Sequence, residues 1–204
     1  MAYQDDIKKA AALLLPWNKL SGCNILVTGA TGLIGGCLVD VLMAHKGRNY
    51  NVYASGRNEE RAGRRFLKYA DDNAFHFVKY DVAQPLEYDV NFQYIIHAAS
   101  GAYPEEFIKH PVEVIKGNIN GLDNLMGYGI QHGIKRLLYI SSGEVYGEGD
   151  GRVFTENYSG YVDCTSLRSC YPSSKRAAET LCISYGAEYG ICLLYTSDAA
   201  DDGE

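Results

Sequence analysis

A tyrosine and a lysine lie four residues apart in the segment Tyr171-Pro-Ser-Ser-Lys175. On a helix, this spacing puts both side chains on one face, where the ammonium favours the ionised phenol. The pair can therefore make the phenol oxygen a general base, although bringing its pKa from about 10 to neutrality needs roughly 4 kcal/mol. Pro172 favours a helix start here, because proline is tolerated in a first turn. The alternative is a surface pair that arose by chance.

A hydroxyl and a carboxylate follow the apolar segment Leu137–Ile140. Ser142 can donate a hydrogen bond to a substrate oxygen on which negative charge develops. Glu144 lies two residues further on and shares the same face if the backbone stays extended, so it can move a proton. The alternative for Glu144 is a loop carboxylate in solvent.

A glycine-rich loop, Thr28 to Gly35, follows the apolar segment Ile25–Val27 and precedes a helical pattern. Glycines at its turn, at the phosphate approach and at the helix–strand contact are typical of dinucleotide binding, with the phosphates at the helix N-terminus. The cofactor contacts predicted from this loop come from Gly29, Thr31, Gly32, Leu33, Ile34 and Gly35.

The choice between NAD and NADP depends on the end of the second strand. A carboxylate there would bind the ribose of NAD, but the sequence reads Ser55-Gly56-Arg57. Ser55 and Arg57 can instead hold the 2′-phosphate of NADP. Arg57 can equally stack on the adenine or face solvent, so both cofactors remain open.

Two further segments lie where strands are expected to end. Asp81-Val82 follows the third strand, where Asp81 can meet the adenine amino group or can simply cap the next turn. The fourth strand ends in His97-Ala98-Ala99-Ser100. The small side chains of Ala98, Ala99 and Ser100 leave room for a cofactor over the sheet edge, and His97 is interpreted as a strand-end residue rather than a catalyst or metal ligand.

Apolar segments alternate with helical patterns along the chain, which predicts an α/β fold with a parallel sheet covered on both faces. The strands are expected at Asn24–Thr28, Asn51–Ala54, Ala74–Val78, Gln93–His97 and Lys135–Ile140, with a sixth starting at Ile191–Tyr195. The helices are expected at about 33–45, 58–70, 111–132 and 172–189. An amphipathic N-terminal helix is expected over residues 4–15, ended by Pro16.

Composition excludes several classes of function. The net charge is −6 with no basic cluster, which argues against nucleic-acid binding. The six cysteines have no Cys-x-x-Cys spacing and no signal peptide accompanies them, which indicates reduced thiols in the cytoplasm and no zinc site. The apolar segment Ala10–Leu15 is too short to span a membrane.

The predicted organisation has three parts. Residues 1–20 hold the N-terminal helix, and residues 21–191 form a NAD(P)-binding domain. Residues 192–204 end in an acidic, small-residue sequence without a strand or helix pattern. We expect this tail to be non-native at the end of an incomplete chain, or else a genuine disordered tail.

Together with Asn118-x-x-Gly121-x-x-Asn124, these motifs resemble the extended short-chain dehydrogenase/reductase superfamily, in its nucleotide-sugar epimerase/dehydratase branch. The resemblance covers about residues 20–191 and implies a Rossmann-like, doubly wound sheet truncated before the C-terminal substrate-binding region. It also implies a catalytic set of Ser142, Tyr171 and Lys175, with Tyr171 and Lys175 contacting the cofactor, and a cofactor contact at Asn118. The family's first step oxidises the sugar C4 hydroxyl.

The sub-branch depends on Gly143-Glu144. UDP-glucuronate decarboxylases carry Ser-Glu there and dTDP-glucose 4,6-dehydratases carry Asp-Glu, so the resemblance implies decarboxylase- or dehydratase-like chemistry at Glu144. It also implies a homodimer for the full-length enzyme, and little or no turnover by these 204 residues alone. The alternatives are a non-catalytic dinucleotide sensor and an NADPH-dependent carbonyl reductase.

Overall fold

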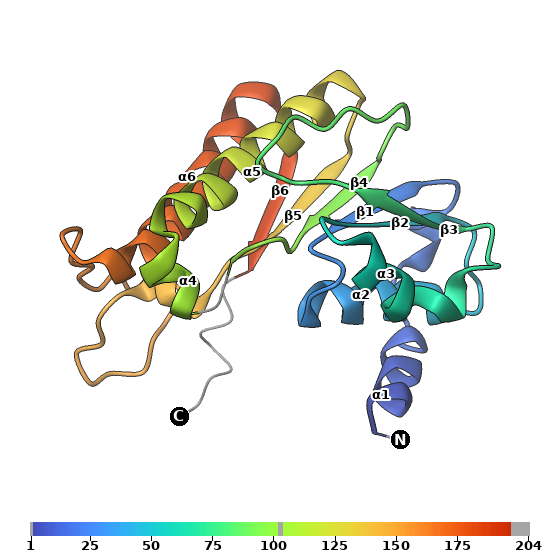
Figure 1. Cartoon of the computed structure of the whole chain (residues 1–204), viewed down its shortest axis with the longest axis horizontal. Coiled ribbons are helices and arrows are strands. Elements are labelled where there is room, and N and C mark those ends of the chain that lie inside the picture. Colours follow the sequence, from blue (N-terminus) through green and yellow to red (C-terminus); the bar gives the residue numbers. More distant parts are fainter. Residues whose placement is uncertain (1, 102–103, 197–204) are drawn as a thin grey trace.

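A computed structural model describes residues 2–101 and 104–196 of the chain. Within this part, six parallel strands form one sheet in the order β3-β2-β1-β4-β5-β6 (Figure 1). The chain runs outward from the central β1 in both directions, which is the doubly wound, Rossmann-like arrangement that the sequence predicted. The strands are β1 (Asn24–Thr28), β2 (Asn51–Gly56), β3 (Phe75–Lys79), β4 (Tyr94–His97), β5 (Arg136–Ile140) and β6 (Cys192–Thr196).

Helices cover both faces of the sheet. Figure 1 shows α5 and α6 side by side on one face, whereas α2 and α3 lie on the other. The α-helices are α1 (Ala2–Ala11), α2 (Leu33–Ala44), α3 (Glu59–Phe66), α4 (Pro104–Lys109), α5 (Pro111–Gln131) and α6 (Cys170–Tyr189). Short 3₁₀ turns are η1 (Trp17–Leu20), η2 (Leu67–Tyr69), η3 (Gly143–Tyr146) and η4 (Leu167–Ser169).

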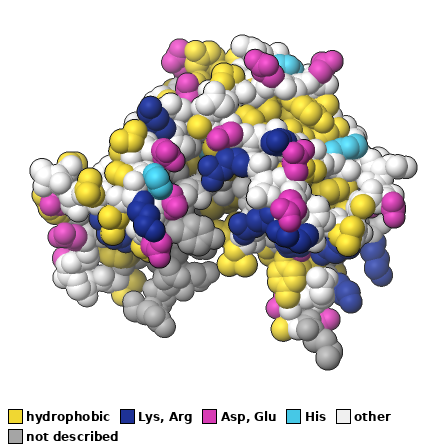
Figure 2. Space-filling model, in the orientation of Figure 1, with side chains coloured by type: hydrophobic (Ala, Val, Ile, Leu, Met, Phe, Trp, Pro, Cys, Tyr) yellow, Lys and Arg dark blue, Asp and Glu magenta, His cyan; other side chains and the backbone are white. Residues whose placement is uncertain are grey.

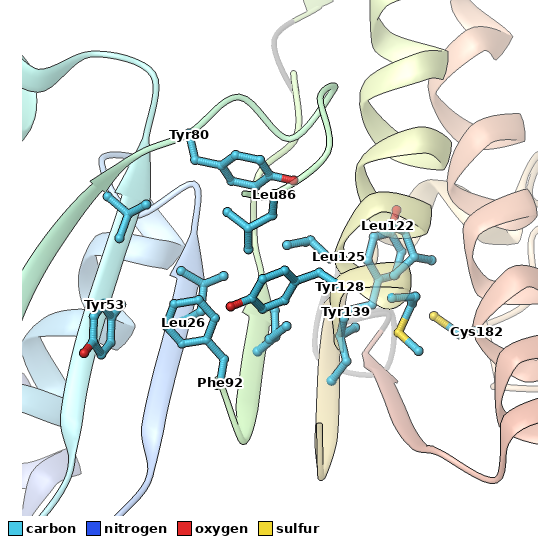
Figure 3. Packing of buried hydrophobic residues seen from close by; sticks show 14 of the residues in the cluster. Leu26, Tyr53, Tyr80, Leu86, Phe92, Leu122, Leu125, Tyr128, Tyr139 and Cys182 are labelled. Atoms are coloured by element: carbon cyan, nitrogen blue, oxygen red, sulfur yellow. The ribbon is translucent and has the colours of Figure 1, made fainter. Parts of the chain in front are cut away.

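The two faces of the sheet hold separate hydrophobic cores. Successive side chains of a strand point to opposite faces, so Leu26 of β1 joins the core under α5 and α6, while Ile25 and Val27 join the core under α2 and α3. Figure 3 shows Leu125 and Tyr128 of α5 in the first core together with Leu26 and Phe92. This double burial explains why the strands read as continuous apolar segments.

A buried carboxylate joins the N-terminal helix to the domain. Asp40 of α2 is fully buried and accepts hydrogen bonds from Tyr3 (2.7 Å), Tyr69 (2.9 Å) and Arg65 (2.6 Å), and Lys68 lies 2.9 Å away. Burial alone would raise the pKa of this carboxyl, but the hydrogen bonds from the two cations and two phenols hold it at about 2. Asp40 therefore connects α1, α2, α3 and η2.

The N-terminal helix is shorter than predicted. It ends at Ala11 instead of residue 15, and Leu13, Leu14 and Leu15 are exposed. Because these leucines contact no core, nothing offsets the entropy of extending the helix. Pro16 also disfavours a helical backbone at the residue before it.

The other element boundaries lie within two residues of the predicted ones, with two exceptions. Helix α4 had no sequence pattern that we interpreted as helical, and the predicted helix 58–70 is divided into α3 and η2. The sixth strand begins at Cys192 and pairs in parallel with β5, so it occupies the start of the range 192–204 that we set apart as a tail. Residues 197–204 lie outside the described residues.

Candidate functional site

The glycine loop connects β1 to α2 at the carboxyl edge of the sheet. Gly29 has a φ of +66°, and a Cβ there would lie 2.6 Å from the carbonyl oxygen of Ala98. A Cβ at Gly35 would lie 2.5 Å from the carbonyl oxygen of Gly29. Both positions therefore require glycine, so that the loop, the end of β4 and the start of α2 can lie close together.

The loop residues beyond this contact face outward. Gly32 and Leu33 are exposed where α2 begins, and Ile34 is about half exposed. Gly32 stands at the N-cap without a side-chain cap, so the first backbone N–H groups of α2 are available to an anion. Thr31 is partly buried and lies beside Gly56, at the end of β2.

The two candidate residues after β2 have different environments. Ser55 is buried, and its hydroxyl finds no hydrogen-bond partner within the described part of the chain. Arg57 is exposed and forms no ion pair with another described residue. Figure 2 shows basic side chains gathered over α3 with acidic ones beside them. Two of the neighbouring cations are paired with acids, Arg64 with Glu60 and Lys79 with Glu59.

Asp81 caps the turn that follows β3, which was the alternative to a contact with adenine. Its Oδ1 accepts a hydrogen bond from the backbone N–H of Ala83 at 3.1 Å. Asp81 is nevertheless exposed, so a contact with an adenine amino group stays a prediction. The backbone oxygen of Val82 accepts a bond from Asn124 at 2.9 Å, which anchors this turn to α5.

His97 is a neutral residue at the end of β4. Its Nδ1 lies 2.8 Å from Oγ1 of Thr28, and the ring is buried. Burial, with a smaller contribution from the positive Lys175, lowers the pKa of His97 to about 3. At neutral pH the imidazole is therefore uncharged, as expected of a strand-end residue. The part of the chain that the structure describes holds no group of three or more possible metal ligands.

Asn118 connects three elements near the site. Its Oδ1 accepts a bond from Ser100 at 2.8 Å, and its Nδ2 donates to Ser174 at 2.9 Å. Ser100 follows β4, Asn118 lies on α5 and Ser174 lies on α6. Both ends of the buried amide therefore bind protein groups and join these three segments, and a contact of Asn118 with a cofactor stays a prediction.

Tyr171 and Lys175 lie in the first turns of α6, with both side chains buried. The Nζ of Lys175 donates to the carbonyl oxygen of Ile140 at 2.8 Å and lies 5.7 Å from the centroid of the Tyr171 ring. It also lies 4.5 Å from the ring centroid of Tyr139. Burial lowers the pKa of Lys175 to about 8, against the attraction of the Glu179 carboxylate. The helix thus holds an ammonium beside the phenol, at the end of β5.

Ser142 and Glu144 follow β5, as predicted, but the turn η3 begins at Gly143, so the backbone is not extended as the predicted shared face required. The Ser142 hydroxyl accepts a weak bond, 3.3 Å, from the backbone N–H of Glu144 and caps the turn η3. Glu144 accepts a hydrogen bond of 2.5 Å from Arg168. The Glu144 side chain is about one third exposed and that of Arg168 about one half, and exposed ion pairs contribute only about 0–1 kcal/mol. A substrate can therefore open this pair at little cost.

Two residues that the sequence reasoning missed link Glu144 to Tyr171. The guanidinium of Arg168 lies 5.3 Å from the ring centroid of Phe107, and the Phe107 ring stacks on Tyr171 with centroids 4.7 Å apart. Phe107 comes from α4, which carried no motif, so no sequence signal pointed to it. Arg168 lies in η4, just before α6, and its contacts with Phe107 and Glu144 come from segments distant in the sequence.

The chain matches a known protein family. The sequence pattern described as "NAD dependent epimerase/dehydratase family" matches residues 25–197. In the described part of the chain, no helix has both the length and the apolar content needed to cross a membrane.

Curated relatives are about twice as long as this chain or longer. UDP-glucuronic acid decarboxylase 6 of Arabidopsis thaliana is 36% identical over 174 residues, which cover 84% of this chain and 48% of that protein. UDP-glucuronic acid decarboxylase 1 of Danio rerio is 33% identical over 169 residues, which cover 82% of this chain and 38% of that protein. The chain therefore spans half or less of these relatives.

Solved structures share the fold at lower identity. A dTDP-glucose 4,6-dehydratase from Streptomyces venezuelae, with NAD bound, is 21% identical with a TM-score of 0.70 over 85% of this chain and 55% of that one. A UDP-glucose 4-epimerase from Thermotoga maritima, with UDP-glucose, is 24% identical with a TM-score of 0.67 over 84% and 54%. At these identities, the likeness concerns the fold alone.

Proposed function

Because this chain belongs to the NAD dependent epimerase/dehydratase family, we propose that it carries the dinucleotide-binding and proton-transfer part of an enzyme that oxidises the C4 hydroxyl of a nucleotide sugar. The observation that carries this proposal is the buried Lys175 ammonium, 5.7 Å from the ring centroid of Tyr171 at the end of β5. A buried ammonium favours an ionised phenol beside it, and an ionised phenol can accept a hydroxyl proton.

The residues of the glycine loop fit a dinucleotide. Gly29 and Gly35 let the loop lie close to the end of β4 and to the start of α2. The uncapped start of α2 offers N–H groups to a pyrophosphate. A bound nicotinamide dinucleotide would accept a hydride from the sugar carbon. The chain's own residues would do the rest: Tyr171 would take the C4 hydroxyl proton, Lys175 would hold the cofactor ribose and favour the tyrosinate, and Ser142 would bind the sugar oxygen.

The second half of the proposed reaction belongs to Glu144. Glu144 follows Ser142 by two residues, and its carboxylate pairs with the half-exposed Arg168, so it can turn to a substrate and move a proton in an elimination or a decarboxylation. The curated relatives favour UDP-glucuronate as the first substrate to test. We expect Glu144→Gln to leave the initial hydride transfer largely intact and to slow the later step. Equal loss of both steps would argue against this role.

The cofactor preference rests on Arg57. The family is described as NAD dependent and the structural neighbour from Streptomyces venezuelae holds NAD, but Arg57, directly after β2, is exposed and forms no ion pair with another described residue. This observation supports NADP as the second candidate. To decide between NAD and NADP, the dissociation constants of both dinucleotides are to be measured with wild type and with Arg57→Ala.

The proposed oxidation is tested by mixing the chain with dinucleotide and UDP-glucuronate in stoichiometric amounts and measuring the nicotinamide absorbance. We expect a small yield of reduced dinucleotide from the wild type that Tyr171→Phe abolishes. Equal yields of reduced dinucleotide from wild type and Tyr171→Phe would refute the assignment of Tyr171. Ser142→Ala is expected to lower the yield without weakening dinucleotide binding.

A further inference from the structure

We propose that Glu179 is a positioning residue of the candidate site, which keeps Lys175 in its charged form and fastens α6 to the segment that carries Ser142. The proposal rests on the proposed function, because the charge on Lys175 matters to a reaction only if it serves Tyr171. Glu179 would touch neither substrate nor cofactor. It would act through the two residues beside it.

The first support is a hydrogen bond across the site. The hydroxyl of Ser141 donates to Oε1 of Glu179 at 2.5 Å. Ser141 is buried and directly precedes Ser142 in the chain. A hydrogen bond to a carboxylate is stronger than a bond between neutral groups, and this one joins α6 to the chain leaving β5. The contact therefore restrains where Ser142 stands relative to the helix that carries Tyr171.

The second support is the helical spacing between Glu179 and Lys175. Both residues lie within α6, four positions apart, so their side chains are neighbours on one face. Lys175 is only 2% exposed, and among the described residues its Nζ donates one hydrogen bond, to the carbonyl oxygen of Ile140. A buried charge is expensive unless an opposite charge lies near it. A carboxylate one helical turn away meets part of this requirement.

The other titratable groups around Lys175 do not meet it. His97 is uncharged at neutral pH, because burial and Lys175 itself lower its pKa to about 3. Burial raises the pKa of Tyr139, so that phenol is also uncharged. Tyr171 is the group that the ammonium would serve. Among the described residues, Glu179 is the acid whose charge raises the pKa of Lys175 against the effect of burial.

The two effects of Glu179 can be separated by substitution. Glu179→Gln removes the charge but keeps an amide oxygen that can accept the bond from Ser141. Ser141→Ala removes the bond but keeps the charge. Glu179→Asp keeps the charge on a shorter side chain. Glu188→Gln is the matched control, because Glu188 is an exposed carboxylate on the same helix, about 20 Å from Lys175 along the axis at 1.5 Å per residue.

The test is the titration of Lys175 followed by NMR of the 13Cε lysine signals in the 204-residue chain, with Lys175→Arg to assign the signal. We expect a midpoint near pH 8 in the wild type, a lower midpoint in Glu179→Gln, and an unchanged one in Glu188→Gln. Glu179→Asp should lie between wild type and Glu179→Gln. An unshifted midpoint in Glu179→Gln would overturn the proposal.

The fastening role has its own readout. Ser141→Ala is expected to leave the Lys175 midpoint in place and to move the backbone amide signals of Ser142 and Gly143. Unmoved signals would overturn this part of the proposal. Neither measurement uses a substrate or a cofactor. A failure of the proposed function, seen as equal hydride transfer by wild type and Tyr171→Phe, is therefore distinguishable from a failure of the role of Glu179.

Discussion

Replacing Lys175 with methionine should stabilise the folded chain at neutral pH, although it removes a residue of the proposed site. The unfolded chain binds the lysine proton with an ordinary pKa of 10.5, whereas burial lowers the folded-state pKa to about 8. One pKa unit corresponds to about 1.4 kcal/mol, so keeping this ammonium charged costs the folded state about 3 kcal/mol. Methionine removes that cost and fills a similar volume.

Part of the gain is offset by lost contacts. The carbonyl oxygen of Ile140 loses the hydrogen bond from Lys175, which costs about 1 kcal/mol, and the ammonium over the Tyr139 ring is also lost. A net gain of about 1–2 kcal/mol remains. Such a gain would indicate that Lys175 serves function at the expense of stability.

The pH dependence fixes the sign of this effect. Below pH 8 both states carry the proton, and the wild type bears the full cost. Between pH 8 and 10.5 the unfolded state binds more protons, so the stability of the wild type rises relative to the variant. Above pH 10.5 the cost has vanished. The free energies of unfolding in urea are compared for wild type and Lys175→Met at pH 7 and pH 10. The reasoning is refuted if the methionine variant is less stable at pH 7, or if the difference does not change with pH.

Three further substitutions test other parts of the structure. Asp40→Asn should destabilise the chain by about 2 kcal/mol at pH 7, since the folded-state pKa of about 2 lies below the ordinary 3.8. The difference from wild type in urea unfolding should shrink as the pH falls from 4 to 2. A constant difference would contradict the buried ion pairs. Gly29→Ala should weaken dinucleotide binding in calorimetry and lower the melting temperature, because a Cβ would lie 2.6 Å from the Ala98 carbonyl oxygen at a φ of +66°. Unaltered binding would contradict the close approach of the loop to the end of β4. Arg57→Ala should weaken NADP binding by roughly tenfold, the equivalent of about 1.4 kcal/mol for one lost charged contact, and leave NAD binding unchanged; an equal loss for both would show that Arg57 does not read the 2′-phosphate.

The parts of the fold that the sequence predicted well are those with strong local patterns. The core strands are continuously apolar because both faces are covered, and the glycine loop has the spacing of a strand–turn–helix connection. The first turn of α6 follows from Pro172, whose missing N–H has no helical partner to lose. These features depend on residues that are close in the sequence, so they can be predicted from one sequence alone.

The parts that were missed depend on contacts between distant segments. Arg168 donates a hydrogen bond to Glu144, 24 residues earlier in the chain. The segment between them is attached to α6 by hydrogen bonds from Arg176 to the carbonyl oxygens of Val145 and Gly160. No periodic pattern in the sequence indicates the course of this segment. The N-terminal helix was predicted too long for a related reason, since whether Leu13 to Leu15 find a core cannot be read from their order. Exposure of Asp81 and burial of Asn118 likewise emerge only from packing.

The central claim is that Tyr171, with Lys175 beside it, accepts the proton when the sugar C4 hydroxyl is oxidised. The most direct test uses UDP-glucuronate deuterated at C4, mixed with the chain and dinucleotide, and mass spectrometry of the recovered dinucleotide. The account predicts reduced dinucleotide that is heavier by one deuterium with the wild type, and none with Tyr171→Phe. Deuterated dinucleotide from Tyr171→Phe at the wild-type level, or none from the wild type, would contradict it.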